Sequence, residues 1–439
     1  MTLFHSTYPD NYDVIVAGGG PAGIAAAVSA ARLGARTALV ERYGILGGML
    51  TSGHVQPILG HAEGRTMYNE VVELLEEGHQ NVRLHKTRNG REVTIDIEEA
   101  KHRLLKLCIE NGVYVYLQTP VVAVVKDGNR VTGVTIGTQD GLQNLYAHAI
   151  VDATGDGFVA AQAGAPHEVG RPSDGRCQPT SIEFTVENVD ETYDFTCWGG
   201  TCPYTLPDGR RYSEVCKEAC KNGELPENVS IVRIHYTMNP GERNINATQV
   251  NGRNTLTVEG SVEAEYLLRE QIPVIVDFLR RVAPGFENCR VKSSATTLGV
   301  RETRRFIGDY IISDEDVEKG ARHEDVVVHK AWFLIDIHNP HGGGQAEGHS
   351  QPATPYDIPY RSLLPRDVEG LLLSGRNISG THRAHASYRV MGVAMPTGQA
   401  AGTAAALAAR EGCTPRQLDY RKVQQALMDY GAQLFHEEE

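Results

Sequence analysis

The sequence predicts an α/β fold in which a doubly wound parallel sheet carries a second, β-rich domain inserted into the chain. Three observations predict it. An apolar run, a glycine turn at 18–23, an alanine-rich stretch and a second apolar run follow one another near the start. Strand and helix patterns then alternate to about residue 165. A buried strand pattern and a small-residue helix return after residue 356, as in a Rossmann-like sheet closed by both chain ends.

The turn at 18–23 has the spacing of a dinucleotide-binding loop. Gly18 permits the tight turn, Gly20 lets the backbone approach a pyrophosphate, and Gly23 lets helix and strand pack closely. The helix that follows offers free N–H groups and a positive dipole end to phosphates. Glu41, at the end of the second apolar run, is expected to accept both ribose hydroxyls, and its charge disfavours a 2′-phosphate. The whole arrangement indicates a dinucleotide site rather than a structural glycine turn.

The elements after Glu41 follow in the order that this fold requires. A glycine-rich but apolar loop comes first, and such a loop is expected to lie against a ligand. Apolar spacing then predicts two helices, a strand, a hairpin and a further strand. In order, these are the loop at 42–53, helices at 67–75 and 100–108, a strand at 113–117, a hairpin turn at 127–129 and a strand at 147–152.

A second glycine turn, Ala-Thr-Gly-Asp-Gly at 153–157, ends this part of the chain. Its glycines allow close approach to a dinucleotide, and a plain β-turn is the alternative interpretation. A buried strand returns at 371–373, and Pro396 is expected to open an alanine-rich helix whose N-terminus makes a second dipole site. With the second turn and the returning helix, FAD is the expected dinucleotide rather than NAD.

The middle of the chain has a different pattern. Strands are expected at 181–186, 231–237 and 254–258, separated by long polar segments. The stretch 261–281 has helical spacing but contains Pro273, so a kink or two short helices are expected. The predicted organisation is therefore a first part of the FAD-binding domain at 1–165, a substrate domain at 166–355, and the returning part of the FAD-binding domain with a C-terminal helix at 356–439.

Length and charge limit the function. The chain has 439 residues, 41% of them hydrophobic, and a net charge of −13, which disfavours nucleic-acid binding because that requires a broad basic surface. Neither a signal peptide nor a membrane-spanning stretch is indicated, so we expect no membrane insertion and a cytoplasmic location. Eight cysteines are too few for a disulfide scaffold.

The motifs together resemble the FAD-dependent oxidoreductases related to the flavoprotein subunits of fumarate reductase and heterodisulfide reductase. The resemblance rests on the two glycine turns, on the loop at 47–51, on the arginine-rich run at 299–305, and on Arg389-Val-Met-Gly with Gly-Gln-Ala-Ala-Gly at 398–402. It implies an FAD domain built from both chain ends, with the flavin ring at the junction with the substrate domain. It also implies that Gly398 and its neighbours meet the pyrimidine edge of the flavin.

Motifs and resemblance predict a set of FAD contacts along the chain. These are Gly18, Gly20, Pro21, Ala22, Gly23, Glu41, Arg42, Gly47, Gly48, Met49, Thr51, Val122, Ala153, Thr154, Gly155, Asp156, Gly375, Arg376, Thr397, Gly398 and Gln399. Two features are missing: there is no reactive disulfide after Glu41, and no second Gly-x-Gly-x-x-Gly for a nicotinamide. NAD(P)H is therefore not expected as a built-in partner.

The catalytic residues are expected in the loop at 377–395, just before the helix that faces the flavin. His382 and His385 could take a proton from a hydroxyl or amine, with Tyr388 and Arg389 beside them. The alternative is that all four are structural residues with hydrogen-bond partners inside the protein.

Substrate binding is assigned to three further residues. Arg301 and Arg361 could clamp a carboxylate through paired donors, and His338 could contact the substrate. A metal at His338 is disfavoured because a typical ligand set is missing. The cysteines at 197, 202, 216 and 220 match no standard zinc or iron–sulfur spacing, so no metal site is predicted.

These observations predict an FAD-dependent oxidoreductase. The favoured reaction is that of a dehydrogenase or oxidase, with hydride passing from a small polar substrate, anionic or neutral, to flavin N5. Two alternatives stay open: an electron-transfer subunit of a larger redox complex, and a reductase of an activated C=C bond. The expected partner is a small molecule, and a second copy of the chain or a redox partner protein is left open.

Overall fold

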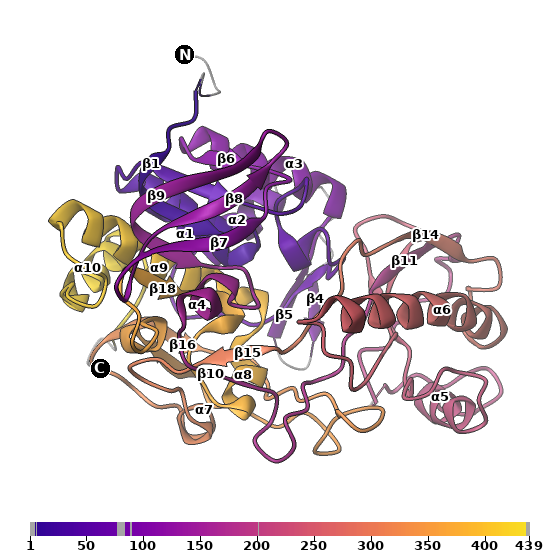
Figure 1. The fold of residues 1–439 in the computed structure, drawn as a ribbon. Helices are drawn as coiled ribbons and strands as arrows, with labels where there is room; N and C mark the ends of the chain where they lie inside the picture. The colour runs from indigo at the N-terminus through magenta and orange to yellow at the C-terminus, as the bar shows by residue number, and fades with distance from the viewer. Residues whose placement is uncertain (1–4, 6, 77–83, 88–89, 201, 436–439) are drawn as a thin grey trace.

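The computed structural model describes residues 5, 7–76, 84–87, 90–200 and 202–435. Its main sheet has seven strands in the order β6-β2-β1-β9-β8-β7, with β18 paired to β9 (Figure 1). The strands β6, β2, β1, the end of β9 and β18 run parallel, and β7, β8 and β9 form an antiparallel meander. The bounds are β1 Asn11–Ala17, β2 Thr37–Val40, β6 Tyr114–Tyr116, β7 Val121–Asp127, β8 Arg130–Thr138, β9 Gly141–Asp152 and β18 Leu371–Leu373.

The first strand and helix form as the sequence predicts. Residues 14–17 of β1 are fully buried on both faces of the sheet, which is the environment of a central parallel strand. The turn after β1 leads into α1 (Pro21–Arg32), with Pro21 at the first helical position, where its missing N–H costs nothing. The predicted doubly wound α/β class is confirmed.

The C-terminal part of the chain completes the same sheet. β18 adds to β9, and helix α9 (Met391–Glu411) packs along α1. Glycines make this close contact, because a Cβ at Gly398 would lie 2.0 Å from the carbonyl oxygen of Ala22 and one at Gly402 would lie 2.0 Å from that of Ala26. The prediction that this helix begins at Pro396 is wrong. The residues before the proline are helical and pack elsewhere, since the N–H of Gly392 donates to the Leu59 carbonyl at 2.9 Å and a Cβ there would lie 1.9 Å from the Gly60 carbonyl oxygen.

A second hydrophobic core lies under a four-stranded antiparallel sheet in the order β12-β13-β11-β14, here called the cap sheet. It draws residues from 182 to 295, whereas residues 306 to 358 contribute to the first core. The predicted boundaries at 165 and 355 stay predictions. The bounds are β11 Phe184–Glu187, β12 Arg233–Tyr236, β13 Arg243–Asn246, β14 Arg290–Ser294 and α5 Tyr212–Lys221.

Helix α6 (Val258–Val282) covers the apolar face of the cap sheet (Figure 1). It is one helix with Pro273 inside it, so the alternative of two short helices is wrong. The strand predicted at 254–258 is also wrong. Asn254 instead begins a turn, with the N–H of Thr257 bonded to its carbonyl, and Thr257 then caps α6.

Smaller elements connect the two cores. Among the described residues, no helix is both long and apolar enough to cross a bilayer. The bounds are η1 Gly48–Leu50, β3 Pro57–Ile58, α2 Met67–Glu76, β4 Leu84–Thr87, β5 Gly90–Thr94, α3 Ile97–Glu110, α4 Phe158–Ala163, β10 His167–Val169, β15 Arg304–Phe306, α7 Asp314–Lys319, β16 Val326–Ala331, β17 Tyr356–Pro359, η2 Tyr360–Leu363, η3 Gly375–Asn377, α8 His382–Tyr388 and α10 Tyr420–Tyr430.

Candidate functional site

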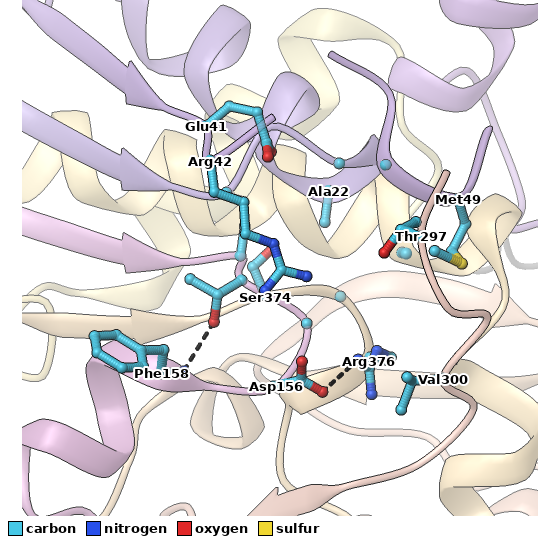
Figure 2. Close-up of a pocket in the computed structure, with 18 of the residues that line it drawn as sticks. Ala22, Glu41, Arg42, Met49, Asp156, Phe158, Thr297, Val300, Ser374 and Arg376 are labelled. Atoms are coloured by element: carbon cyan, nitrogen blue, oxygen red, sulfur yellow. Dashed lines mark hydrogen bonds and ion pairs between the residues drawn. The ribbon is translucent and has the colours of Figure 1, made fainter. Parts of the chain in front are cut away.

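A cavity of about 770 Å³ lies at the carboxyl ends of the parallel strands, the usual ligand position in this class of sheet. Figure 2 shows that it extends from Glu41 and Arg42 at one end to Met49 and Thr297 at the other, with Val300 below them. Its walls come from both ends of the chain and from residues 255–261 and 297–304. Its volume is in the range of cofactor pockets.

The start of α1 forms one wall of this cavity. No side chain caps the helix, so its first N–H groups are open to a ligand. A Cβ at Gly20 would meet no protein atom within 4 Å and would project into the cavity. The bare glycine therefore makes a cradle that fits a pyrophosphate at a positive helix end.

Glu41 lines the cavity and also holds the turn together. Its carboxylate accepts hydrogen bonds from the backbone N–H of Gly19 at 2.6 Å and of Tyr43 at 2.8 Å. Burial raises the pKa of Glu41, against the lowering effect of these two bonds. Each carboxylate oxygen thus accepts one hydrogen bond from the protein. The predicted contact of Glu41 with ribose stays a prediction.

The second glycine turn is shaped by two aspartates. Asp152 accepts bonds from the N–H groups of Thr154 at 3.0 Å and Ala160 at 2.8 Å, which fixes the turn against α4. Asp156 accepts from Arg376 at 2.6 Å and from Thr303 at 2.8 Å. Burial opposes ionisation of Asp156, but the guanidinium of Arg376 holds its pKa below the ordinary value. Figure 2 shows this pair across the cavity floor.

Cationic side chains are concentrated around this cavity. Arg42, Arg304, Arg376 and Arg389 all line it, against Glu41 and Asp156. This positive excess matches a ligand with two phosphate charges. FAD fits this cavity because of its volume, its positive charge, the glycine cradle at Gly20 and the open N-terminus of α1.

Most of the predicted FAD residues line the cavity. They are Gly18, Gly20, Pro21, Ala22, Glu41, Arg42, Gly48, Met49, Ala153, Thr154, Gly155, Asp156, Gly375 and Arg376. On β7, Val121 and not Val122 lies at the cavity, and Val122 is 41% exposed. Successive side chains point to opposite faces of a strand, so an error of one residue reverses the assignment.

Six further predicted FAD residues stand behind the cavity wall and shape it. Gly23 allows close packing, because a Cβ there would lie 1.8 Å from the Gly18 carbonyl oxygen. Thr51 donates to the Leu46 carbonyl at 2.6 Å, next to Gly47, which has a left-handed backbone. Thr397, Gly398 and Gln399 lie inside α9: the first accepts from the Gly375 N–H at 3.1 Å, the second packs on α1, and the third accepts from the Met67 N–H at 2.9 Å.

Gly398→Ala is therefore expected to damage the fold rather than only the cofactor site. The added Cβ would clash with the Ala22 carbonyl, and overpacking of this kind costs about 1–3 kcal/mol or more. Alanine regains about 1 kcal/mol in helix propensity. Urea unfolding of FAD-free protein measures the balance, with Gly20→Ala as the control, because its Cβ meets no atom. An unchanged midpoint for Gly398→Ala would contradict the packing role.

Among the four predicted catalytic residues, only Arg389 lines the cavity. Its guanidinium donates to the backbone carbonyl and to the carboxylate of Asp336, both at 3.0 Å. Tyr388 is buried and donates to the Ile378 carbonyl at 3.0 Å, so its hydroxyl has a structural partner.

The two histidines lie on α8, behind the cavity. His382 bonds to Glu302 at 2.7 Å. Burial opposes ionisation of Glu302, but this bond and nearby cationic groups lower its pKa to about 2. His385 is buried without a hydrogen-bond partner on either ring nitrogen, and burial lowers its pKa well below the ordinary value. The structure does not bring either imidazole to the cavity, and a proton-transfer role for them stays a prediction.

The three predicted substrate-binding residues do not lie together in one site. Arg301 follows directly after Val300 of the cavity wall, and it donates to the Pro179 carbonyl at 2.8 Å and to Ser181 Oγ at 3.0 Å. His338 bonds to Asp336 at 3.2 Å, and burial lowers its pKa to about 3. Arg361 is 50% exposed and holds Asp325 with two bonds, away from the cavity residues.

Several cavity residues were not predicted from the sequence. Those from the first domain flank predicted strands and turns, and so could have been found by position. Thr255 and Leu256 come from the turn before α6 and Ser261 from its first turn, and none of them belongs to a motif. The complete set is Val40, Tyr43, Pro120, Val121, Phe158, Ala161, Gln162, Thr255, Leu256, Ser261, Thr297, Leu298, Val300, Arg304, Ser374, Met391 and Ala394.

The cap sheet meets the first domain beside the end of the cavity that holds Met49. Thr185 of β11 accepts a bond from Gln56 at 3.2 Å, and Asn244 of β13 donates to the His54 carbonyl at 3.0 Å. Both partners belong to the segment that follows Met49 in the chain. A polar face of the cap sheet therefore contacts the segment next to this end, while the cavity wall itself is made there by Met49, Thr297, Leu298 and Val300.

All eight cysteines are free thiols. Within the described ranges, no group of three or more His, Cys, Asp or Glu side chains is arranged to hold a metal ion.

Comparison with known proteins supports the assignment of the cavity to FAD. A family model described as FAD dependent oxidoreductase matches residues 13–427. The chain is 27% identical to digeranylgeranylglycerophospholipid reductase of Picrophilus torridus over 231 residues, covering 47% of this chain and 55% of the relative. It is 33% identical to dihydrolipoyl dehydrogenase of Trypanosoma brucei brucei over 103 residues, covering 23% of this chain and 20% of that one.

Solved structures resemble the chain in overall fold. One is a geranylgeranyl bacteriochlorophyll reductase-like protein from Thermoplasma acidophilum, with 15% identity, a TM-score of 0.48, and coverage of 96% of this chain and 83% of the other. Another is a flavin-dependent brominase, with 13% identity, a TM-score of 0.46, and coverage of 96% and 83%. The chain spans about half the length of the curated reductases that it matches. The match to the family model covers nearly the whole chain, and the protein belongs to the FAD-dependent oxidoreductase family, with FAD as its cofactor.

Proposed function

We propose that this enzyme oxidises a small polar organic molecule by transferring a hydride to its FAD. One observation carries the proposal: the segment that follows Met49, at this end of the cavity, is hydrogen-bonded to the polar face of the cap sheet. Buried polar groups next to that end of the cavity suit a small polar substrate better than a wholly apolar one.

The protein residues would bind, orient and exclude water. The α1 N-terminus, Gly20 and Arg42 would hold the dinucleotide end, and Met49 with residues 297–300 would enclose the other end. Bound FAD supplies the two-electron chemistry at flavin N5. Arg389 would place a positive charge beside the reacting end, held in orientation by its two bonds to Asp336.

A second candidate is the reduction of an activated C=C bond. Curated relatives named as digeranylgeranylglycerophospholipid reductases favour it, although they align with only part of this chain. The same enclosure would serve either direction of transfer. We also propose a closer relation to the fumarate reductase and heterodisulfide reductase flavoproteins, which the motifs at 47–51 and 299–305 support. Reoxidation of the flavin by a redox partner protein is a further part of this proposal.

Arg389→Lys tests the function at the cavity wall. Lysine keeps a charge for Asp336 but lacks the other N–H donors of the planar guanidinium, because both bonds to Asp336 come from Nη2 alone. Bound FAD should therefore persist while substrate-dependent flavin reduction slows by roughly a hundredfold. Arg383→Lys is the matched control, because Arg383 lies on the neighbouring helix and pairs with Glu318 and Glu347. Anaerobic stopped-flow absorbance measures both. Equal rates for the two variants would remove Arg389 from the reaction.

A further inference from the structure

Three strands of the cap sheet place polar residues in one row. Phe184 of β11 pairs with Ile245 of β13 in an antiparallel register, so Glu183 lies opposite Asn246, and Asn246 pairs with Arg233 of β12. Phe184 and Ile245 belong to the apolar core. Because side chains alternate along a strand, Glu183, Asn246 and Arg233 share the opposite face, which is turned to the FAD-binding domain.

Buried polar atoms without partners surround this face. They are Glu183 Oε2, Asn244 Oδ1 and Gln178 Nε2, with Ser52 Oγ and His54 Nδ1 on the segment opposite. Each of these side chains is more than nine-tenths buried. Native proteins leave few buried polar groups unpaired, because each costs about 1–3 kcal/mol. Five such atoms on facing segments indicate a place where a polar ligand binds.

Two arginines at this place have no counter-ion. Arg233 makes no hydrogen bond or ion pair among the residues that the structure describes. Arg301 donates to the Pro179 carbonyl and Ser181 Oγ, and no described carboxylate lies within ion-pair distance of it. The charge of Arg233 acts on Arg301 and on Glu183, so the three side chains are neighbours.

Accessible space reaches the ion pair next to these arginines, and this space is here called the hollow. Arg389 and Asp336 lie in the protein interior, yet their side chains keep 13% and 21% of their area exposed. Exposed area at such depth requires an internal space. Arg389 also lines the cofactor cavity, so this space adjoins it. Asp336 is paired with Arg389 and bonded to His338, and its charge also acts on Arg301 and Arg233, so this one carboxylate faces three guanidinium groups.

Glu183 does not supply the missing negative charge either. Burial raises its pKa to about 8, against the lowering effect of Arg301, so it is mainly protonated at neutral pH. The hollow therefore carries two unbalanced guanidinium charges. Arg233 and Arg301 are partly buried. An unpaired charge withdrawn from bulk water is costly, and a bound anion reduces that cost.

We propose that Arg233 and Arg301 together bind a carboxylate group of the substrate. The inference rests on the proposed function and narrows it: the substrate is a small organic acid, anchored by its carboxylate to the cap sheet, with its reactive carbon toward the cofactor cavity. Gln178 and the protonated Glu183 would donate further hydrogen bonds to the same acid. Guanidinium groups are suited to this task because they hold carboxylates with paired donors.

The experiment titrates the FAD-bound enzyme with sodium malonate and sodium acetate, and with acetamide as the neutral counterpart. Calorimetry and the visible flavin spectrum report binding. Malonate should bind, acetamide should not, and Arg233→Met should weaken malonate binding about tenfold to a hundredfold. Arg301→Lys, which keeps a donor for the Pro179 carbonyl, should act in the same direction. Arg290→Met is the control, because Arg290 lies on the same sheet but pairs with Glu187 at the surface.

The outcomes separate the two proposals. Carboxylate binding that depends on Arg233, without any metabolite that changes the flavin redox state, would support the anion site and overturn the proposed function. A neutral metabolite that reduces the flavin equally well in both arginine variants would support the function and overturn the carboxylate assignment. Loss of FAD from the variants, with malonate binding unchanged, would also overturn it, because the arginines would then serve the cofactor.

Discussion

Gly20→Val is expected to give a folded protein that does not retain FAD. The backbone at Gly20 has φ −74° and ψ −176°, which valine adopts without strain. Its side chain would enter the cavity, since a Cβ there meets no protein atom. Its methyl groups would occupy the space beside the α1 N-terminus, and steric overlap of about 3 kcal/mol weakens binding roughly a hundredfold.

The measurement is the FAD content of purified protein, followed by titration of the FAD-free form. Bound FAD stabilises the folded state by mass action, so thermal stability must be compared with FAD-free wild type. Gly200→Val is the control, because Gly200 is an exposed glycine with equally open space around its Cβ and lies away from the cavity. Stoichiometric FAD in Gly20→Val would contradict the placement of the cofactor.

Glu183→Gln is expected to be more stable than the wild-type protein, by a difference that grows as the pH rises. The pKa of Glu183 is about 8 in the folded protein, raised mainly by burial, and about 4.5 when unfolded. Between these values the unfolded state has lost the proton that the folded state keeps, so wild-type stability falls by about 1.4 kcal/mol for each pH unit. Glutamine has no proton to lose. The groups facing Glu183 are Arg233, Arg301 and Asn244.

Urea unfolding at pH 5 and at pH 8 measures this effect. The stability gain of Glu183→Gln over wild type should be small at pH 5 and larger by several kcal/mol, roughly, at pH 8. Glu187→Gln on the same strand is the control, because Glu187 is partly exposed and ion-paired with Arg290. A gap that does not change with pH would mean that Glu183 is ionised in the folded protein, paired with one of the two arginines.

Local chemistry explains what could be predicted from the sequence. The turn at 18–23, Glu41 and the turn at 153–157 could be placed because glycine spacing and strand ends act over a few residues. Val122 does not line the cavity, whereas its neighbour Val121 does, since strand register depends on pairing with β8 and not on local pattern.

The remaining differences come from tertiary packing. Pro396 has a strong local tendency to begin a helix, but α9 begins at Met391, where Gly392 packs on Leu59 and Gly60. Gly398 then packs on Ala22 instead of facing the cavity. Histidine is a residue type suited to catalysis, yet α8 places His385 behind the wall of the cavity. Arg233 carries no motif, and only the register of three strands brings it beside Glu183 and Arg301.

A small organic acid is expected to exchange electrons with the FAD at the end of the cavity next to the cap sheet. Anaerobic incubation of the enzyme with a panel of small metabolites, read as flavin absorbance, tests it most directly. The oxidised enzyme should be bleached, or the chemically reduced enzyme reoxidised, by at least one carboxylate in the panel, and Arg233→Met should slow that change. Flavin that responds only to neutral metabolites or to a protein donor would contradict the account.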